Sequence, residues 1–236
     1  MDRLPAALGL LALAHVGPAA SWLPSVRRRL PALAGAGHPD HVALTFDDGP
    51  DPRSTPSFLD ALERAGTRAT FFVLGEMLER HPEQARRIVA AGHEIAVHGW
   101  RHDNALRTRP GRVTAGLRRT VALVRATTGV HPVWYRPPYG VLSAEALVAA
   151  RALGLRPVLW TAWGRDWAAG ATPASVLATL RPDLRGGATV LLHDSDCTSS
   201  PGSWRSALGA LPDLIAQCGG AGLRVGPLRE HGVGAR

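Results

Sequence analysis

The sequence contains no lysine, so all 27 basic side chains among its 236 residues are arginines. It has only 2 cysteines, Cys197 and Cys218, and they lack the CxxC spacing of a zinc knuckle. The sequence does not decide whether the two form a disulfide. With 2 tyrosines and 4 phenylalanines, few rings are available to stack on bases, and no nucleic-acid-binding motif is present. We therefore expect no nucleic-acid partner, although a formal net charge of +8 suits some other anionic partner.

Residues 4–23 are predominantly apolar, but two prolines and a histidine interrupt them, which disfavours a membrane-spanning helix. Residues 6–14 have the length of a signal-peptide core, and small residues follow them. The positive cluster at residues 27–29 comes after the apolar stretch, which is the wrong side for export. We expect residues 1–37 to be a leader or a membrane anchor. The protein is then extracytoplasmic, either secreted or membrane-anchored, with a cytoplasmic location as the alternative.

Residues 38–236 alternate short apolar runs with longer stretches of helical character, as one α/β domain would. Prolines at positions 82, 110 and 173 suit the first turns of helices. The expected strands cover residues 41–46, 69–73, 94–97, 133–136, 156–160, 189–192 and 224–227. This alternation predicts right-handed βαβ units, hence an α/β fold whose parallel sheet is open or closed into a barrel.

A cluster of polar residues follows each of five expected strands. In chain order the clusters read DDGP, HGWRH, RPPYG, WGRDW and LLHD. The carboxyl ends of parallel strands face one side of an α/β fold, and barrels build their active sites on that side. We therefore expect these distant segments to meet in one mouth.

Two histidines and one aspartate in these clusters are candidate metal ligands. His98 and His102 are four residues apart, a spacing that places both side chains on one face of a helical turn. Asp48 would complete a three-ligand set that leaves positions open for water and substrate. The set suits catalytic zinc and also the iron of non-haem oxygenases, so the ligands alone leave the metal open.

Three further residues suit proton transfer around such a metal. With Asp48 bound to a cation, the neighbouring carboxylate of Asp47 becomes tolerable and can accept a proton from metal-bound water. His193 in LLHD is the candidate acid for the leaving group. A carboxylate beside it, either Asp166 or Asp194, would orient its ring and raise its pKa.

The segment RPPYG supplies two more candidates. Its two prolines make a rigid loop and leave the N–H of Tyr139 free to stabilise an oxyanion. Arg136, the first residue of the segment, would hold Asp47 ionised and oriented. Tryptophans at positions 134, 160, 163 and 167 gather around the fourth and fifth expected strands, where aromatic faces suit either a core or sugar rings.

In this order, TFDDGP, HGWRH, RPPYG, RDW and LLHD resemble the five motifs of the polysaccharide deacetylases, the fourth family of carbohydrate esterases. The family's domain is named after chitooligosaccharide deacetylases. The resemblance implies a distorted (β/α) barrel of about seven parallel strands with helices outside. It also implies a divalent metal, most often zinc, and removal of acetyl groups from N-acetylated sugars or acetylated xylan.

The resemblance implies that Asp47 is the base, that Arg136 orients it, and that the metal ligands are Asp48, His98 and His102. It also implies that His193 is the acid, tuned by Asp166, and that Tyr139 supplies the amide donor. Trp167 and Leu191 would form apolar walls around the acetyl methyl. Two positions depart from the family pattern. Gly99 replaces a usual serine or threonine, and Trp163 stands where the fourth motif often has aspartate. Neither change removes a ligand or a proton-transfer group, so we expect activity.

We therefore expect a monomeric, metal-dependent hydrolase that removes acetyl groups from a glycan by attack of metal-bound water. Peptidoglycan, chitin oligomers and other wall polysaccharides all fit the motifs, and the net positive charge favours an anionic wall polymer. Three alternatives stay open. They are a catalytically inactive glycan-binding module with the same cleft, a 2-His-1-carboxylate iron oxygenase and a basic surface protein that binds anions.

Overall fold

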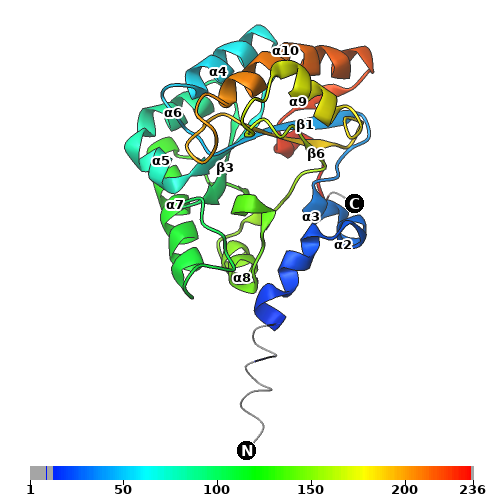
Figure 1. The fold of residues 1–236 in the computed structure, drawn as a ribbon. Coiled ribbons are helices and arrows are strands. Elements are labelled where there is room, and N and C mark those ends of the chain that lie inside the picture. The colour runs from blue at the N-terminus through cyan, green and yellow to red at the C-terminus, as the bar shows by residue number, and fades with distance from the viewer. Residues whose placement is uncertain (1–8, 10–12, 235–236) are drawn as a thin grey trace, which may run out of the picture.

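In the computed structural model, which describes residues 9 and 13–234, eight parallel strands form one curled sheet (Figure 1). Seven strands follow the order β5-β4-β3-β2-β1-β7-β6, and β8 pairs with β1. The sheet curls into a half-barrel with helices around it, which confirms the predicted distorted (β/α) barrel. The strands are β1 (His41–Asp47), β2 (Thr70–Leu74), β3 (Glu94–Gly99), β4 (Trp134–Tyr135), β5 (Arg156–Pro157), β6 (Ala162–Trp163), β7 (Thr189–His193) and β8 (Arg224–Gly226).

The two faces of β1 separate the core from the site. Every residue of this strand is buried, as in a central strand of a parallel sheet. Because side chains alternate along a strand, Val42, Leu44 and Phe46 pack outward into the core beneath the helices. Thr45 and Asp47 point the other way, and both contact the same buried arginine inside the half-barrel. Alternation along one strand therefore delivers a carboxylate to the interior.

The surrounding helices are α4 (Thr55–Arg64), α5 (Gly75–Arg80), α6 (Pro82–Ala90), α7 (Arg112–Thr128), α8 (Ala144–Ala152), α9 (Pro173–Leu180) and α10 (Trp204–Gly220), with short 3-10 turns η2 (Pro138–Gly140) and η3 (Leu228–Glu230). Pro82 and Pro173 occupy first-turn positions, as expected. The expectation for Pro110 is wrong, since α7 begins at Arg112. Gly111 precedes it with a φ of 82°, a left-handed conformation that no right-handed helix continues through.

The predicted strand over residues 156–160 is also wrong in its second half. β5 ends at Pro157, and a separate strand, β6, begins at Ala162. The backbone between them bonds to other parts of the chain. The Leu159 N–H donates to Leu33, the Leu159 carbonyl accepts from a buried arginine, and the Trp160 carbonyl accepts from Arg27.

An N-terminal helical segment, residues 17–34, packs beside the barrel near α8 (Figure 1). It consists of η1 (Gly17–Trp22), α2 (Pro24–Arg29) and α3 (Pro31–Ala34). The expected leader of residues 1–37 stays a prediction, and most of its signal-like core, residues 6–14, lies outside the described residues. Among the residues that are described, no helix combines the length and apolarity needed to cross a membrane.

Candidate active site

Three predicted ligands meet at the carboxyl end of the sheet. Asp48 follows β1, His98 lies in β3, and His102 follows β3 in a loop. The candidate ligand atoms of the three lie within 4.8 Å of one another. The Asp48 Oδ1 atom is 3.4 Å from His98 Nε2 and 3.7 Å from His102 Nε2. The structure therefore brings together side chains from the carboxyl ends of β1 and β3, which lie on either side of β2 in the sheet.

The helical turn predicted for HGWRH is wrong. His98 belongs to a strand, and the chain bends at Gly99, whose φ of 133° is unfavourable for a residue with a side chain. A Cβ on Gly99 would also lie 3.1 Å from the Arg101 carbonyl oxygen. The bend nevertheless returns His102 toward His98, with ring centroids 5.2 Å apart. Gly99 thus provides the bend that brings the second histidine back.

The donor atoms of this cluster fit a divalent cation. Asp48 Oδ1 is buried and has no hydrogen-bond partner among the described residues, while the Thr198 hydroxyl binds Oδ2. His98 Nδ1 is 2.8 Å from the Arg136 carbonyl oxygen, which fixes the tautomer and leaves Nε2 free as a ligand. Burial lowers the pKa of His98 to about 3, although Asp48 opposes the shift. The imidazole is therefore neutral, as metal binding requires.

Asp47 lies beside the cluster and is paired with Arg136. Both are buried, and Arg136 Nη1 donates to Asp47 Oδ1 over 2.7 Å. The same guanidinium donates to the Thr45 hydroxyl and, through Nη2, to the Leu159 carbonyl. Burial raises the pKa of Asp47, and the Arg136 charge opposes this rise. Asp47 Oδ2 is left facing His98, 3.8 Å from its Nε2.

His193 faces Asp47 from the neighbouring strand. The register of β1 and β7 pairs these two residues directly. Asp166 Oδ1 lies 3.0 Å from His193 Nδ1, and its Oδ2 accepts from the His193 backbone N–H. Burial acts to lower the pKa of His193, but Asp166 and the other nearby carboxylates outweigh it and raise the pKa to about 10. Of the two candidate partners, Asp166 therefore holds the ring, whereas Asp194 binds Gly49 and Thr55.

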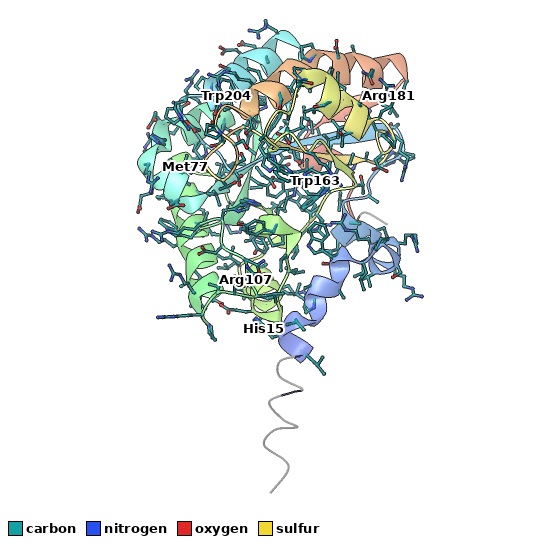
Figure 2. The ribbon with its side chains drawn as sticks, viewed as in Figure 1. His15, Met77, Arg107, Trp163, Arg181 and Trp204 are labelled. Atoms are coloured by element: carbon teal, nitrogen blue, oxygen red, sulfur yellow. The ribbon has the colours of Figure 1, made fainter. Side chains whose placement is uncertain are left out.

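A cavity of about 320 Å³ opens over these groups. Its walls include the predicted apolar residues Trp167 and Leu191, together with Tyr139, whose backbone is left-handed at φ 58°. Trp163 also lines it and lies near the middle of the half-barrel in Figure 2. The lining residues are Trp22, Asp47, His98, His102, Pro137, Tyr139, Gly140, Trp160, Trp163, Trp167, Leu191, His193, Thr198 and Ser199.

Sequence reasoning missed two contributors to this site. Thr198, which binds Asp48, belongs to no motif and follows β7 in a loop. Trp22 lies in the segment expected to be a leader. Neither position gives a sequence signal, because each reaches the site only through contacts distant in the chain. Cys197, beside Thr198, is a free thiol like Cys218, so the two form no disulfide.

Comparison with known proteins identifies the family. A family model described as polysaccharide deacetylase matches residues 34–158. The chain is also 39% identical over 190 residues to a chitooligosaccharide deacetylase from Bradyrhizobium sp. (strain ANU 289), covering 79% of this chain and 82% of that protein. The chain belongs to the polysaccharide deacetylase family.

Solved polysaccharide deacetylase structures share the fold. The peptidoglycan N-acetylglucosamine deacetylase Bc1960 superposes with a TM-score of 0.80 at 29% identity, covering 89% of this chain and 97% of that one. A family pseudoenzyme from Bacillus anthracis, BA3943, superposes with a TM-score of 0.75 at 26% identity, covering 83% of this chain and 67% of that one. A mutant of the pseudoenzyme is described as having restored enzymatic activity. Membership of the polysaccharide deacetylase family therefore does not by itself establish catalysis.

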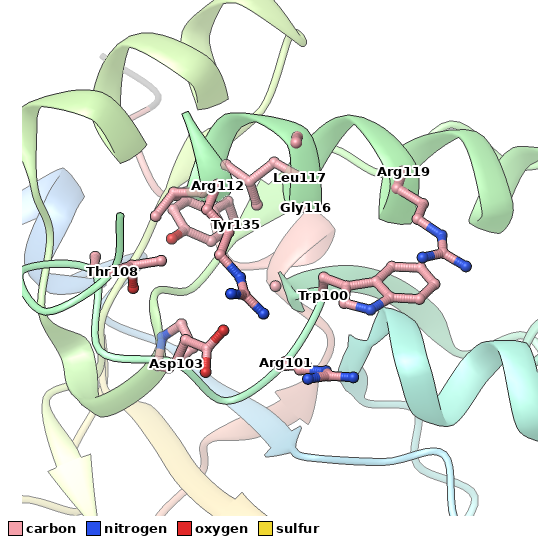
Figure 3. Close-up of a pocket in the computed structure, with 14 residues that line it drawn as sticks. Trp100, Arg101, Asp103, Thr108, Arg112, Gly116, Leu117, Arg119 and Tyr135 are labelled. Atoms are coloured by element: carbon pink, nitrogen blue, oxygen red, sulfur yellow. The ribbon is translucent and has the colours of Figure 1, made fainter. Parts of the chain in front are cut away.

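Basic side chains lie beside the candidate site, near α7 and the loop after β3. A second cavity, shown in Figure 3, lies between the loop after β3 and α7, with Arg101, Arg112 and Asp103 at its opening. Arg119 stacks on Trp100 there, 3.6 Å from the ring centroid. An adjoining open groove of about 630 Å³ shares His102 and Tyr139 with the cavity over the candidate ligands and is also lined by Arg107, Arg109 and Arg112.

Proposed function

We propose that this polysaccharide deacetylase removes acetyl groups from an N-acetylated glycan with a bound divalent cation, zinc. The observation that carries the proposal is the β1–β7 register, which sets Asp47 beside His193 over the cluster of Asp48, His98 and His102. A base and an acid thus flank one ligand set. When bound, the cation would polarise the acetyl carbonyl and lower the pKa of water.

The chain's own residues would carry the protons. Asp47 would accept one at Oδ2 from the attacking water, because Arg136 occupies Oδ1 and favours the ionised form. His193 would donate one to the leaving nitrogen from Nε2, because Asp166 holds Nδ1. The Tyr139 N–H would stabilise the oxyanion of the tetrahedral intermediate. Trp167 and Leu191 would enclose the acetyl methyl.

Two alternatives receive less support. An inactive glycan-binding module has no use for the buried Asp47–Arg136 and His193–Asp166 pairs. Burying such charges costs desolvation free energy that only partner charges and hydrogen bonds offset. An iron oxygenase would use the three ligands but neither of these two pairs. Both pairs support hydrolysis, although a pseudoenzyme shares the fold.

The arginine-lined groove supports an anionic polysaccharide as the substrate. Arg107, Arg109 and Arg112 have no ion-pair partner among the described residues, and the groove continues from His102 and Tyr139. A glycan that carries carboxylates, as peptidoglycan does in its peptide stems, would extend from the catalytic cavity into this positive field. We also propose an extracytoplasmic location, where such polymers lie, and retain chitin oligomers as the neutral alternative.

Two substitutions test the catalytic proposal. Asp47→Asn should lower acetate release from N-acetylglucosamine oligomers at least about 10²-fold and keep the metal, because it removes only the proton acceptor. His98→Ala should lose the metal itself, as measured by elemental analysis. Asp60→Asn, at an exposed position of α4, is the control and should leave both unchanged. Near-normal acetate release by Asp47→Asn would contradict the assignment of the base.

A further inference from the structure

One wall of the catalytic cavity comes from outside the barrel. Trp22, the last residue of η1, lines the cavity together with His102 and His193. Its ring centroid lies 6.0 Å from that of Trp160 and 6.5 Å from that of Trp163, both in edge-to-face arrangement. The family model matches from residue 34 onward, so this residue lies outside the matched part of the chain.

Trp22 is held in place by Arg27. The Arg27 guanidinium carbon lies 5.4 Å from the Trp22 ring centroid and 5.4 Å from that of Trp160. Its Nη1 donates to the Trp160 carbonyl, and its Nε donates to the carbonyl of buried Ser21. A guanidinium shared by two indoles combines cation–π attraction with directed hydrogen bonds. The ring orientation of Trp22 is therefore fixed before any ligand arrives.

Hydrogen bonds connect the end of the segment that carries Trp22 to the barrel, next to the two edges of the sheet. β5 and β6 are the last strands of the sheet on its two sides, and residues 158–161 connect them. The Leu33 carbonyl accepts from the Leu159 N–H over 2.8 Å, and the Gly35 carbonyl accepts from the Thr189 hydroxyl over 2.6 Å. The first of these bonds takes up a backbone N–H from the connection between β5 and β6, and the second ties the chain just after the segment to a side chain of β7.

The tryptophans around the cavity differ in solvent exposure, which shows which of their rings a ligand could contact. Trp160 is 5% exposed and serves as packing, whereas Trp22 and Trp167 are 41% and 40% exposed. Both exposed rings line the same cavity, whose volume is at the small end of the range for ligand pockets. A polymer substrate must extend past such a cavity, and the exposed rings are the surfaces that it would meet.

We propose that Trp22 is a substrate-binding residue that stacks on a pyranose ring of the glycan chain, with Arg27 as its positioning residue. The proposal rests on the proposed function. The apolar C–H face of a pyranose matches an indole face, and burying both removes apolar surface from water. The N-terminal segment would then set the preference for oligomers over small acetylated compounds.

Paired kinetics test this proposal. In Trp22→Ala, kcat/KM for the pentamer of N-acetylglucosamine should fall about tenfold, mainly through KM, because the stacking surface is lost. Hydrolysis of a small aryl acetate, which has no second sugar ring to stack on the indole, should fall much less than hydrolysis of the pentamer. Trp22→Phe should retain most of the pentamer activity, and Leu23→Ala, an exposed neighbour outside the cavity, should retain all of it. Equal losses on both substrates, or no loss on either, would overturn the proposal.

Binding measurements separate this proposal from the proposed function. Calorimetric titration of the pentamer into Asp47→Asn, with and without Trp22→Leu, requires no turnover. Trp22→Leu keeps an apolar side chain that maintains the fold but removes the aromatic face, and it should weaken binding about tenfold. If the wild type releases no acetate, the proposed function fails while this difference still tests Trp22. Equal affinity in the two proteins, or no binding to either, would refute a role for Trp22.

Discussion

Two adjacent carboxylates, Asp47 and Asp48, lie at the carboxyl end of β1, and their surroundings differ. Asp47 points into the half-barrel, where the buried guanidinium of Arg136 balances it. Asp48 adopts a left-handed φ of 80° and turns toward the two imidazoles, and its Oδ1 has no hydrogen-bond partner within the part of the chain that the structure describes. Two like charges are tolerated here because an arginine neutralises one of them, and the cation that we propose would neutralise the other.

The role proposed for His193, that of the acid, provides a prediction at the residue scale that depends on pH. His193 donates only while protonated, so the rate should fall as pH rises through its pKa. Asp166 raises this pKa, and Asp166→Asn removes the negative charge. The alkaline limb of the pH–rate profile should therefore move to lower pH by about one unit or more.

The measurement is kcat against pH for the wild type and Asp166→Asn, each with its metal content determined. A cation bound near Asp48 lowers the wild-type limb as well, so the comparison is between the two profiles and not with an absolute value. An alkaline limb that does not move, with the metal retained, would show that Asp166 does not act through His193.

At the scale of elements, α5 supports the loop that carries His102. Gly75 begins α5, and a Cβ there would lie 2.5 Å from the Thr120 hydroxyl of α7 and 2.5 Å from the Trp100 ring. The Glu76 N–H also donates to the Trp100 carbonyl over 3.0 Å. This close approach of α5, α7 and the loop after β3 requires a residue without a side chain.

Gly75→Ala should therefore destabilise the fold by about 1–3 kcal/mol, because the rigid indole must move to admit the methyl group. Urea denaturation measures the free energy of unfolding. Gly219→Ala is the matched control, since a Cβ at this helical position in α10 meets nothing within 4 Å. It should be neutral or stabilising by up to about 1 kcal/mol. The same loss of stability in both variants would contradict the packing argument.

At the scale of the whole molecule, the positive charge has a local consequence. The chain has a formal net charge of +8, and its basic residues are all arginines. Several of these arginines line the groove beside the cavity of the candidate site. We expect kcat/KM for peptidoglycan fragments that carry carboxylates to fall as salt rises, because salt screens exposed charges. For neutral N-acetylglucosamine oligomers it should stay nearly constant.

Removing two of these charges should reduce the difference in salt dependence between charged and neutral substrates. Arg107→Gln together with Arg109→Gln should lower activity on the charged fragments several-fold and leave neutral oligomers unaffected. Arg86→Gln together with Arg87→Gln removes the same charge from α6, away from the groove, and serves as the control. A similar loss in both double variants would indicate a general effect of net charge and not recognition in the groove.

The sequence by itself determined the α/β architecture and the family. Apolar strands and helices that begin with proline are local patterns. Each of the five ordered motifs is a short run of residues that can be recognised whatever the distance to the next one. Local patterning failed where an element was too short to show a period, as in β6 with its two residues, or where a glycine bend replaced an expected helical turn, as at Gly99.

Only the tertiary structure decided which side chains face one another. It selected Asp166 over Asp194 as the partner of His193, brought Thr198 to Asp48, and placed Trp22 in the cavity wall. These contacts join segments far apart in the chain, and several depend on strand register, in which a shift of one residue reverses the direction of every side chain. A linear pattern fixes which faces of an element are buried, but the pairing of distant elements depends on the packing of the whole barrel.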